Sequence, residues 1–123
     1  MSYNIDHCKT RSINGLVIPV TALYTDASKR FGIGQPAIVD MAEMNVRIDI
    51  AEGCIEGRLK DGNLHVSLIS IFGDGSGYAY EDVLKPALKQ SKGEWRARFV
   101  WEGGDSINTL SVKDGEITEE TED

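Results

Sequence analysis

The sequence predicts an α+β fold, an antiparallel β-meander of five or more strands with one or two short helices. An all-β partly closed barrel or a sandwich is the alternative. Apolar and polar residues alternate through residues 44–50, 54–72 and 95–101, as expected for strands with one buried face. Asp-Gly pairs at 61–62 and 114–115 mark two tight hairpin turns. Helical spacing is confined to short stretches, so the sheet is expected to dominate.

The clearest element is a hairpin in the stretch CIEGRLKDGNLHVSLISIF, residues 54–72. A two-residue turn in it pairs Leu59 with Leu64. Counting outward from the turn, Ile55 falls opposite Leu68. A slip of one residue would turn the apolar face to solvent, so the turn and the pattern specify the same register.

Further strands are expected on both sides of this hairpin. Residues 44–50, MNVRIDI, form the preceding strand. Residues 94–102, EWRARFVWE, place their aromatic side chains on one face and Arg96 and Arg98 on the other. Residues 107–112 follow after a turn, and the second Asp-Gly pair returns the chain. These segments complete the meander.

The first third of the chain is expected to contain a helix. Residues 19–31 have helical spacing, Pro19 suits the first helical position and Gly32 can cap the end. The alternative is a hairpin closed by Asn14-Gly15, which would confine the proline to an edge strand.

Two further helices are predicted from the positions of prolines. A short helix is expected to begin at Pro36. Residues 80–93, YEDVLKPALKQSKG, also have a helical pattern, and Pro86 is expected to split that helix.

Length and composition indicate one soluble domain. The chain has 123 residues, of which 41% are hydrophobic and 27% charged. Because no apolar run approaches the ~18 residues of a membrane span and no signal peptide is apparent, we expect a cytoplasmic protein with no membrane association. Cys8 and Cys54 are too few for a disulfide scaffold, so free thiols are expected.

The net charge of −7 is concentrated at the C-terminus. Residues 114–123 hold six acids and no base, which leaves 14 acids and all 13 bases on residues 1–113. We therefore expect a single globular domain at residues 1–113 and an acidic C-terminal tail at residues 114–123. Such a tail either aids solubility or binds a basic surface.

The glycine-rich stretch IFGDGSGYAYED, residues 71–82, does not match the common ligand-binding loops. A phosphate loop requires Lys and Ser or Thr after its last glycine, whereas Tyr-Ala-Tyr follows Gly77. A helix-loop-helix calcium site that began at Asp74 would place Lys85 where a bidentate acid is required. We expect a glycine-rich connection, with an irregular calcium site as the minor alternative.

No catalytic or metal-binding constellation is predicted. His7 and Cys8 are adjacent and would point to opposite faces of a strand. The hairpin register separates Cys54 from His65 and pairs His65 with Arg58. The spacings of these histidines and cysteines are not those of structural zinc sites. We therefore expect no catalytic residue, no metal ligand and no cofactor, and a non-enzyme is favoured over an enzyme.

A basic segment follows the glycine-rich stretch, with five bases against a single acid between Lys85 and Arg98. The interleaved aromatic residues share one strand face and are expected in the core, which leaves the arginines exposed. The predicted partner-binding residues are Lys85, Lys89, Lys92, Arg96 and Arg98 on this segment, with Asp74, Tyr78 and Tyr80 on the loop before it.

The leading functional hypothesis is a non-enzymatic cytoplasmic protein-binding or regulatory module of the inhibitor, immunity or adaptor type. It rests on small size and on the separation of the basic segment from the acidic tail. The alternative is a small-molecule-binding curved sheet or minimal enzyme, with Tyr78, Tyr80 and the tryptophans lining a pocket. A weak single-stranded nucleic-acid binder is a further alternative. A protein partner is favoured over nucleic acid.

Overall fold

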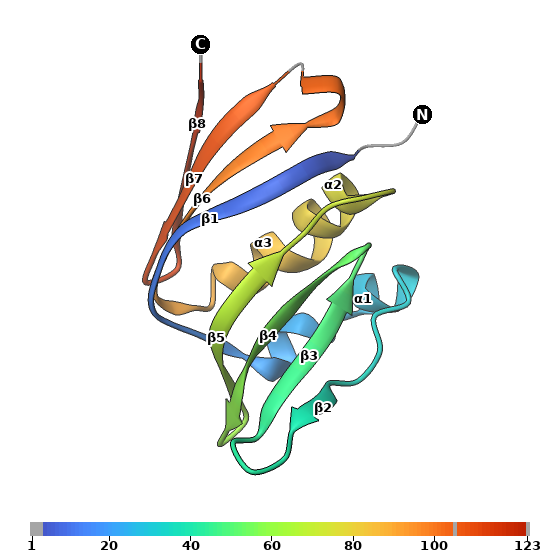
Figure 1. Cartoon of the computed structure of the whole chain (residues 1–123), viewed down its shortest axis with the longest axis vertical. Helices are drawn as coiled ribbons and strands as arrows, with labels where there is room; N and C mark the ends of the chain where they lie inside the picture. Colours follow the sequence, from blue (N-terminus) through green and yellow to red (C-terminus); the bar gives the residue numbers. More distant parts are fainter. Residues whose placement is uncertain (1–3, 105, 123) are drawn as a thin grey trace.

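The computed structural model describes residues 4–104 and 106–122, and its strands form one antiparallel sheet in the order β2-β3-β4-β5-β1-β6-β7-β8 (Figure 1). The strands are β1 (Ile5–Pro19), β2 (Ala37–Asp40), β3 (Asn45–Ile50), β4 (Gly53–Lys60), β5 (Asn63–Ser70), β6 (Lys92–Trp101), β7 (Ile107–Lys113) and β8 (Glu116–Thr121). The helical segments are η1 (Val20–Leu23), α1 (Asp26–Arg30), α2 (Ser76–Ala79), η2 (Tyr80–Leu84), α3 (Lys85–Leu88) and η3 (Glu102–Gly104). The prediction of a sheet-dominated antiparallel fold is confirmed. The sheet is open, and its helices are so short that the α+β label fits only loosely.

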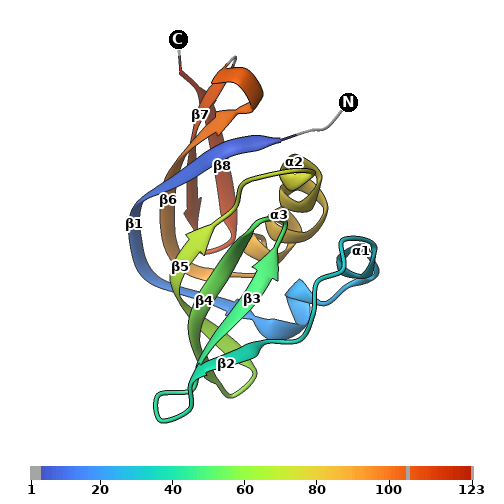
Figure 2. The same ribbon diagram turned by 45° about the vertical axis from the view of Figure 1, so that its right-hand side comes forward.

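The sheet curves around one helical run made of α2, η2 and α3 (Figures 1 and 2). This run buries Val83, Leu84 and Leu88, and β6 buries Trp95 and Phe99. Strands β1 and β3 to β7 contribute buried apolar side chains to the core, and burial of that surface stabilises the fold, whereas all four residues of β2 are exposed. No helix among the described residues is long and apolar enough to cross a membrane.

The first strand, β1, pairs with two partners in succession. Its first part pairs with β6, and its last residues, Val17 to Pro19, pair with β5. Gly15 has a φ of 61° within the irregular pairing between Asn14 and Val17, so the strand bends there and does not reverse. The alternative of a hairpin closed by Asn14-Gly15 is therefore wrong.

The helix predicted over residues 19–31 is also corrected. Pro19 ends β1, and the backbone N–H of Val20 donates to the carbonyl of Gly62 at 2.9 Å. Only the short segments η1 and α1 are helical in this range. Leu16 and Ile18 are both buried, because the period-two pattern of the strand continues up to the proline.

The β4–β5 hairpin forms with the predicted turn and with Leu59 opposite Leu64. The pairing of Ile55 with Leu68 was wrong, because a β-bulge in β5 shifts the register and Ile55 lies opposite Ile69. Leu68 is consequently 40% exposed. The bulge lies beside Gly57, where an added Cβ would come within 2.4 Å of the carbonyl oxygen of His65.

The two proline-based helix predictions need correction. Pro36 precedes a strand, since a residue before proline is held extended and the β-branched residues Ile38 and Val39 follow it in β2. Pro86 does not split its helix. The preceding turn η2 is π-helical, and the N–H of Lys85 donates to the carbonyl of Tyr80. This wider turn accommodates a proline ring that would clash in a regular α-helix.

Two segments differ in length from their predictions: the glycine-rich connection is shorter, and the last strand is longer. The glycine-rich connection covers only residues 71–75, because β5 ends at Ser70 and the helix begins at Ser76. The turn at Asp114-Gly115 forms as predicted and leads into β8, which pairs with β7 from Glu116 to Thr121. The acidic residues expected as a solvated tail are therefore an edge of the sheet as far as Thr121.

Candidate functional site

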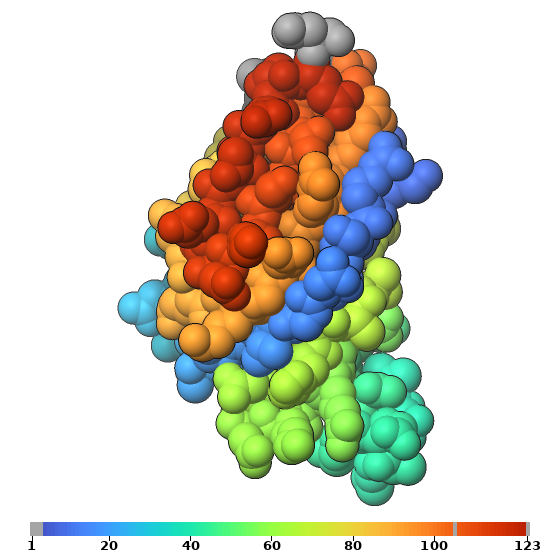
Figure 3. Space-filling model, turned by 90° about the vertical axis from the view of Figure 1, so that its left-hand side faces the viewer, coloured from blue at the N-terminus to red at the C-terminus, as the bar shows by residue number. Residues whose placement is uncertain are grey.

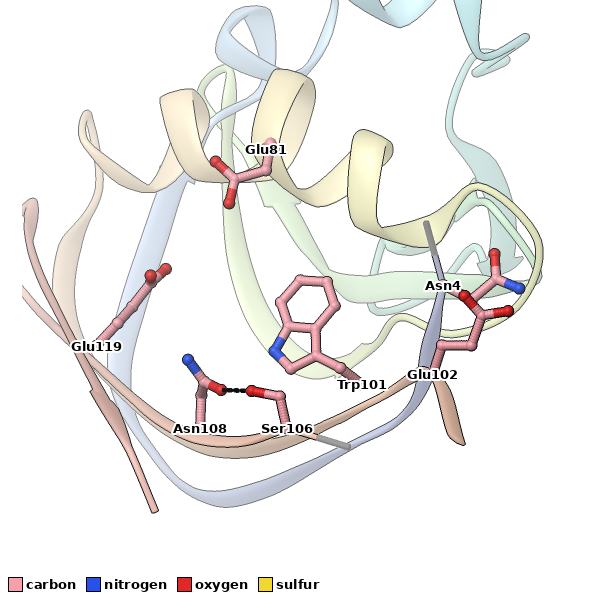
Figure 4. A pocket seen from close by; sticks show the side chains of 7 residues that line it. All are labelled: Asn4, Glu81, Trp101, Glu102, Ser106, Asn108 and Glu119. Atoms are coloured by element: carbon pink, nitrogen blue, oxygen red, sulfur yellow. Dashed lines mark hydrogen bonds between the residues drawn. The ribbon is translucent and has the colours of Figure 1, made fainter. Parts of the chain in front are cut away.

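A cavity of about 330 Å³ opens between the helical turn η2 and the strands β6 to β8 (Figure 4). Its walls come from segments far apart in the sequence. The lining residues are Asn4, Glu81, Trp101, Glu102, Ser106, Asn108 and Glu119. The volume falls in the range of sites for small ligands or for one long side chain.

Trp101 lies at the centre of the lining, and the sheet core holds it there (Figure 4). Its ring centroid is 6.3 Å from that of Tyr80 and 6.2 Å from that of Phe99. Tyr80 and Phe99 are themselves in edge contact at 5.1 Å. Aromatic pairs at these distances attract each other, so the indole is held in place as a wall of the cavity.

Glu119 faces the cavity because of the ladder register. It lies opposite Leu110, which in turn lies opposite Ala97, and the last two are buried on the concave side. The phenol of Tyr80 donates a hydrogen bond to Glu119 Oε1. Burial raises the pKa of Tyr80 and the bond to Glu119 raises that pKa further, so the phenol keeps its proton at neutral pH.

Lys85 joins the two carboxylates on opposite sides of the cavity. Its ammonium nitrogen lies 3.6 Å from Glu119 Oε1 and 3.7 Å from Glu81 Oε2. The Lys85 side chain is only 27% exposed, so these contacts are less screened than those of a surface pair.

The remaining polar lining is held by hydrogen bonds. The Ser106 hydroxyl donates to Asn108 Oδ1 at 3.0 Å (Figure 4). Asn4 Oδ1 accepts from the backbone N–H of Gly75 at 2.9 Å, and the Asn4 carbonyl accepts from the N–H of Glu102 at 3.0 Å. These bonds join the strand ends and the start of the helical run around the rim of the cavity.

The electrostatics of the cavity favour a cation. Three carboxylates line it, from Glu81, Glu102 and Glu119, and the ammonium of Lys85 lies between two of them. Among the described residues, no group of three or more His, Cys, Asp or Glu side chains has metal-binding geometry. Three carboxylates outnumber the single ammonium of Lys85, so the cavity lining carries a net negative charge.

The five predicted basic contact residues lie on different surfaces. Lys85 reaches the cavity, while Lys89 and Lys92 are exposed near the end of the helical run. Arg96 and Arg98 lie on the outer face of the sheet, where β8, β7, β6, β1 and β5 lie side by side (Figure 3). Arg98 is paired with Glu122 at 3.3 Å.

Sequence reasoning did not find Lys9, which lies opposite Arg98 on β1 and adds to this outer basic surface. The pairing of β1 with β6 could not be foreseen from local patterns. The three predicted loop residues are also separated. Asp74 and Tyr78 are exposed, whereas Tyr80 is only 1% exposed and acts through its bond to Glu119.

Most of the cavity lining was missed as well. Trp101 belonged to the predicted aromatic face. The alternative hypothesis placed the tryptophans in a pocket lining, and Trp101 does line the cavity. Glu119 carried a usable signal. It shares the period-two phase of Ile117, so its carboxylate occupies a position where an inward-facing residue is expected.

Neither cysteine is suited to nucleophilic chemistry. Cys8 and Cys54 are both free thiols. Burial raises the pKa of Cys8 to about 12, against a smaller opposing effect of a backbone hydrogen bond with Ile71. Burial also raises the pKa of Cys54, and the charge of Glu56 adds to that effect. Both thiols therefore stay protonated at neutral pH.

No protein-family model matches the chain, and comparison with curated proteins and with solved structures gives no match either.

Proposed function

We propose that this chain is a binding module whose cavity accepts a positively charged group joined to a flat or apolar portion. One observation carries the proposal, the convergence of Glu81 and Glu119 from opposite walls onto a space bounded by Trp101. The proposal keeps the sequence-based hypothesis of a protein-binding or regulatory module. A small organic cation and a basic side chain of a partner protein share the chemistry that this cavity would recognise.

The cavity offers such a group two kinds of attraction. Carboxylates in a partly enclosed site attract a cation more strongly than they would in open water. An indole attracts a cation across its face, and its apolar area covers the aliphatic part of a ligand. The polar groups of Asn108 and Ser106 supply hydrogen bonds that fix orientation.

Lys85 has a defined part in this proposal. Its ammonium already contacts Glu81 and Glu119, so an incoming cation competes with it for the same oxygens. Because Lys85 already balances part of the negative charge, the site is expected to select its ligand mainly by shape and by contact with Trp101.

The test is a titration at pH 7 with Nα-acetyl-L-arginine amide, followed by tryptophan fluorescence and by calorimetry. Trp101 is half-buried at the cavity, whereas Trp95 is fully buried, so the emission change should disappear in Trp101→Phe. Glu119→Gln is expected to weaken binding by about tenfold, because one charged contact is lost.

Two controls make the titration specific. Glu120→Gln removes the same charge from the opposite face of β8 and should leave the affinity within about twofold of the parent, as expected for a screened surface charge. Nα-acetyl-L-citrulline amide has nearly the shape of the arginine probe without its charge and should bind much more weakly. Equal affinity for the two amides would refute a cation site.

A further inference from the structure

We propose that the open edge of β8 pairs with an extended basic segment of a partner protein, which delivers one basic side chain into the cavity. The inference deepens the proposed function and rests on it for the side-chain contact. The strand pairing itself rests on separate observations of the backbone.

The backbone of β8 presents an unpaired row of donors and acceptors. β8 is the last strand of the sheet order, and the N–H of Glu122 donates to the carbonyl of Ile107 at 2.7 Å. Bonds to a neighbouring strand alternate along a strand, so the N–H and C=O groups of Ile117, Glu119 and Thr121 face away from β7. An open edge of this kind is a template for an added strand.

The same alternation links the edge to the cavity. Residues directly opposite each other in an antiparallel pair project their side chains to the same face of the sheet. Glu119 projects to the concave face and lines the cavity. A residue of the added strand opposite Glu119 would therefore project its own side chain into the cavity, between Glu119 and the neighbouring lining residues.

Charge complementarity decides the kind of partner. Between Glu116 and Glu122 the chain carries four acids and no base. A second copy of β8 would bring these acids against one another, and like charges across an interface cost binding free energy. A segment with basic side chains on both faces meets Glu119 on the concave face and Glu120 on the outer face.

The probe is the acetylated and amidated peptide Thr-Lys-Arg-Thr-Val. In the antiparallel register that places its arginine opposite Glu119, its lysine lies opposite Glu120 and its valine opposite Ile117. The arginine N–H then donates to β8, whereas the lysine N–H points to solvent. Hydrogen exchange should show new protection at the N–H groups of Ile117, Glu119 and Thr121 when this peptide binds.

N-methylation of the peptide separates backbone pairing from side-chain capture. A methyl group on the arginine nitrogen should weaken binding by about tenfold, since it blocks hydrogen bonds to the edge. The same methyl group on the lysine nitrogen is the matched control and should leave the affinity within about twofold of the parent, because that nitrogen is not used in the pairing.

A variant pair tests the edge from the protein side. Thr121→Pro removes an outward N–H that β7 does not use, and proline is tolerated at such edge positions. Thr121→Pro should weaken binding of the peptide by severalfold, whereas Thr121→Ala should leave the affinity unchanged. Retained protection of the β7 ladder in hydrogen exchange would show that the proline variant is folded.

Each outcome distinguishes the two proposals. Equal affinity of the two methylated peptides overturns strand pairing, while continued sensitivity to Glu119→Gln leaves the cation site intact. A second result would overturn the cation site and keep the strand pairing. In that result, methylation of the arginine nitrogen alone abolishes binding, and Glu119→Gln has no effect. Absence of binding by the unmodified peptide at millimolar concentration overturns this inference.

Discussion

The two edges of the open sheet are built in different ways. β2 has large apolar side chains in and just after the strand, with Ile38, Val39 and Met41 exposed by 53, 59 and 72%. Its ladder with β3 is short and contains an irregularity between Ile38 and Asp40, and Pro36 precedes it. β8 has an unbroken ladder with β7 and is rich in glutamate.

The comparison shows two ways to keep a sheet edge from unwanted pairing. A short, irregular strand beside a proline is a poor template in spite of its apolar side chains. A regular strand is a good template, and repelling charges restrict what can pair with it. Only β8 adjoins the cavity, so the edge with the better pairing geometry is also the one joined to a recognition site.

The largest expected effect comes from cutting the link between β8 and the helical run. Tyr80→Phe removes the hydroxyl that donates to Glu119 and keeps the ring packing. We expect a loss of about 2 kcal/mol in the free energy of unfolding, the usual worth of a hydrogen bond to a charged group. Urea unfolding measures it. An unchanged unfolding midpoint would show that β8 is held without this bond.

The same variant should alter the pH dependence of stability. The pKa of Tyr80 in the folded chain is raised above its ordinary value of 10.0, chiefly by burial. Above pH 10.0 the unfolded chain loses the phenol proton of Tyr80 and the folded chain keeps it, so the free energy of unfolding falls as the pH rises. Tyr80→Phe should show a shallower decline of stability between pH 9 and about pH 11 than the parent. Parallel declines would contradict the assignment.

An intermediate effect is expected from isoleucines on the two edges. Ile117 of β8 packs against the core, whereas Ile38 of β2 is half exposed at the other edge. Ile117→Ala should lower the free energy of unfolding by about 1 kcal/mol and Ile38→Ala by less than about 0.5 kcal/mol. Thermal and urea unfolding of the two variants side by side check this order. A reversed order would mean that β2 is the better anchored edge.

The smallest stability effects are expected from changes of exposed charge. Val39→Lys in β2 and Glu120→Lys in β8 should each alter the free energy of unfolding by less than about 0.5 kcal/mol. The two substitutions should nevertheless differ in their effect on the affinity for the basic peptide. Glu120→Lys places a lysine opposite the peptide's lysine and should weaken binding, whereas Val39→Lys should not. Equal weakening would indicate non-specific attraction to the whole acidic protein.

Local patterns were sufficient for the hairpins. The β4–β5 and β7–β8 turns follow from Asp-Gly pairs, and the faces of β6 follow from strict alternation, because both depend on neighbours in sequence. The bulge in β5 was not foreseen. It depends on the close approach of two backbones at Gly57, which alternation does not reveal.

The cavity depended on contacts that are distant in sequence. Asn4 reaches it only because β1 is inserted beside β6, and Glu119 reaches it because the acidic end is a paired strand. The continuous helix through Pro86 was missed for a related reason. Local rules predict a break at proline, whereas burial of Val83 and Leu88 on the concave side holds the widened turn in place.

The two partners of β1 also constrain the order in which this chain can assemble. The strands β3 to β5 and β6 to β8 are joined by short connections and can form as two local meanders. The strand that joins them is made first, yet its partners extend from Asn63 to Trp101. During synthesis, β1 must therefore wait with its apolar face uncovered until most of the chain has emerged, and its docking unites the two meanders in one sheet.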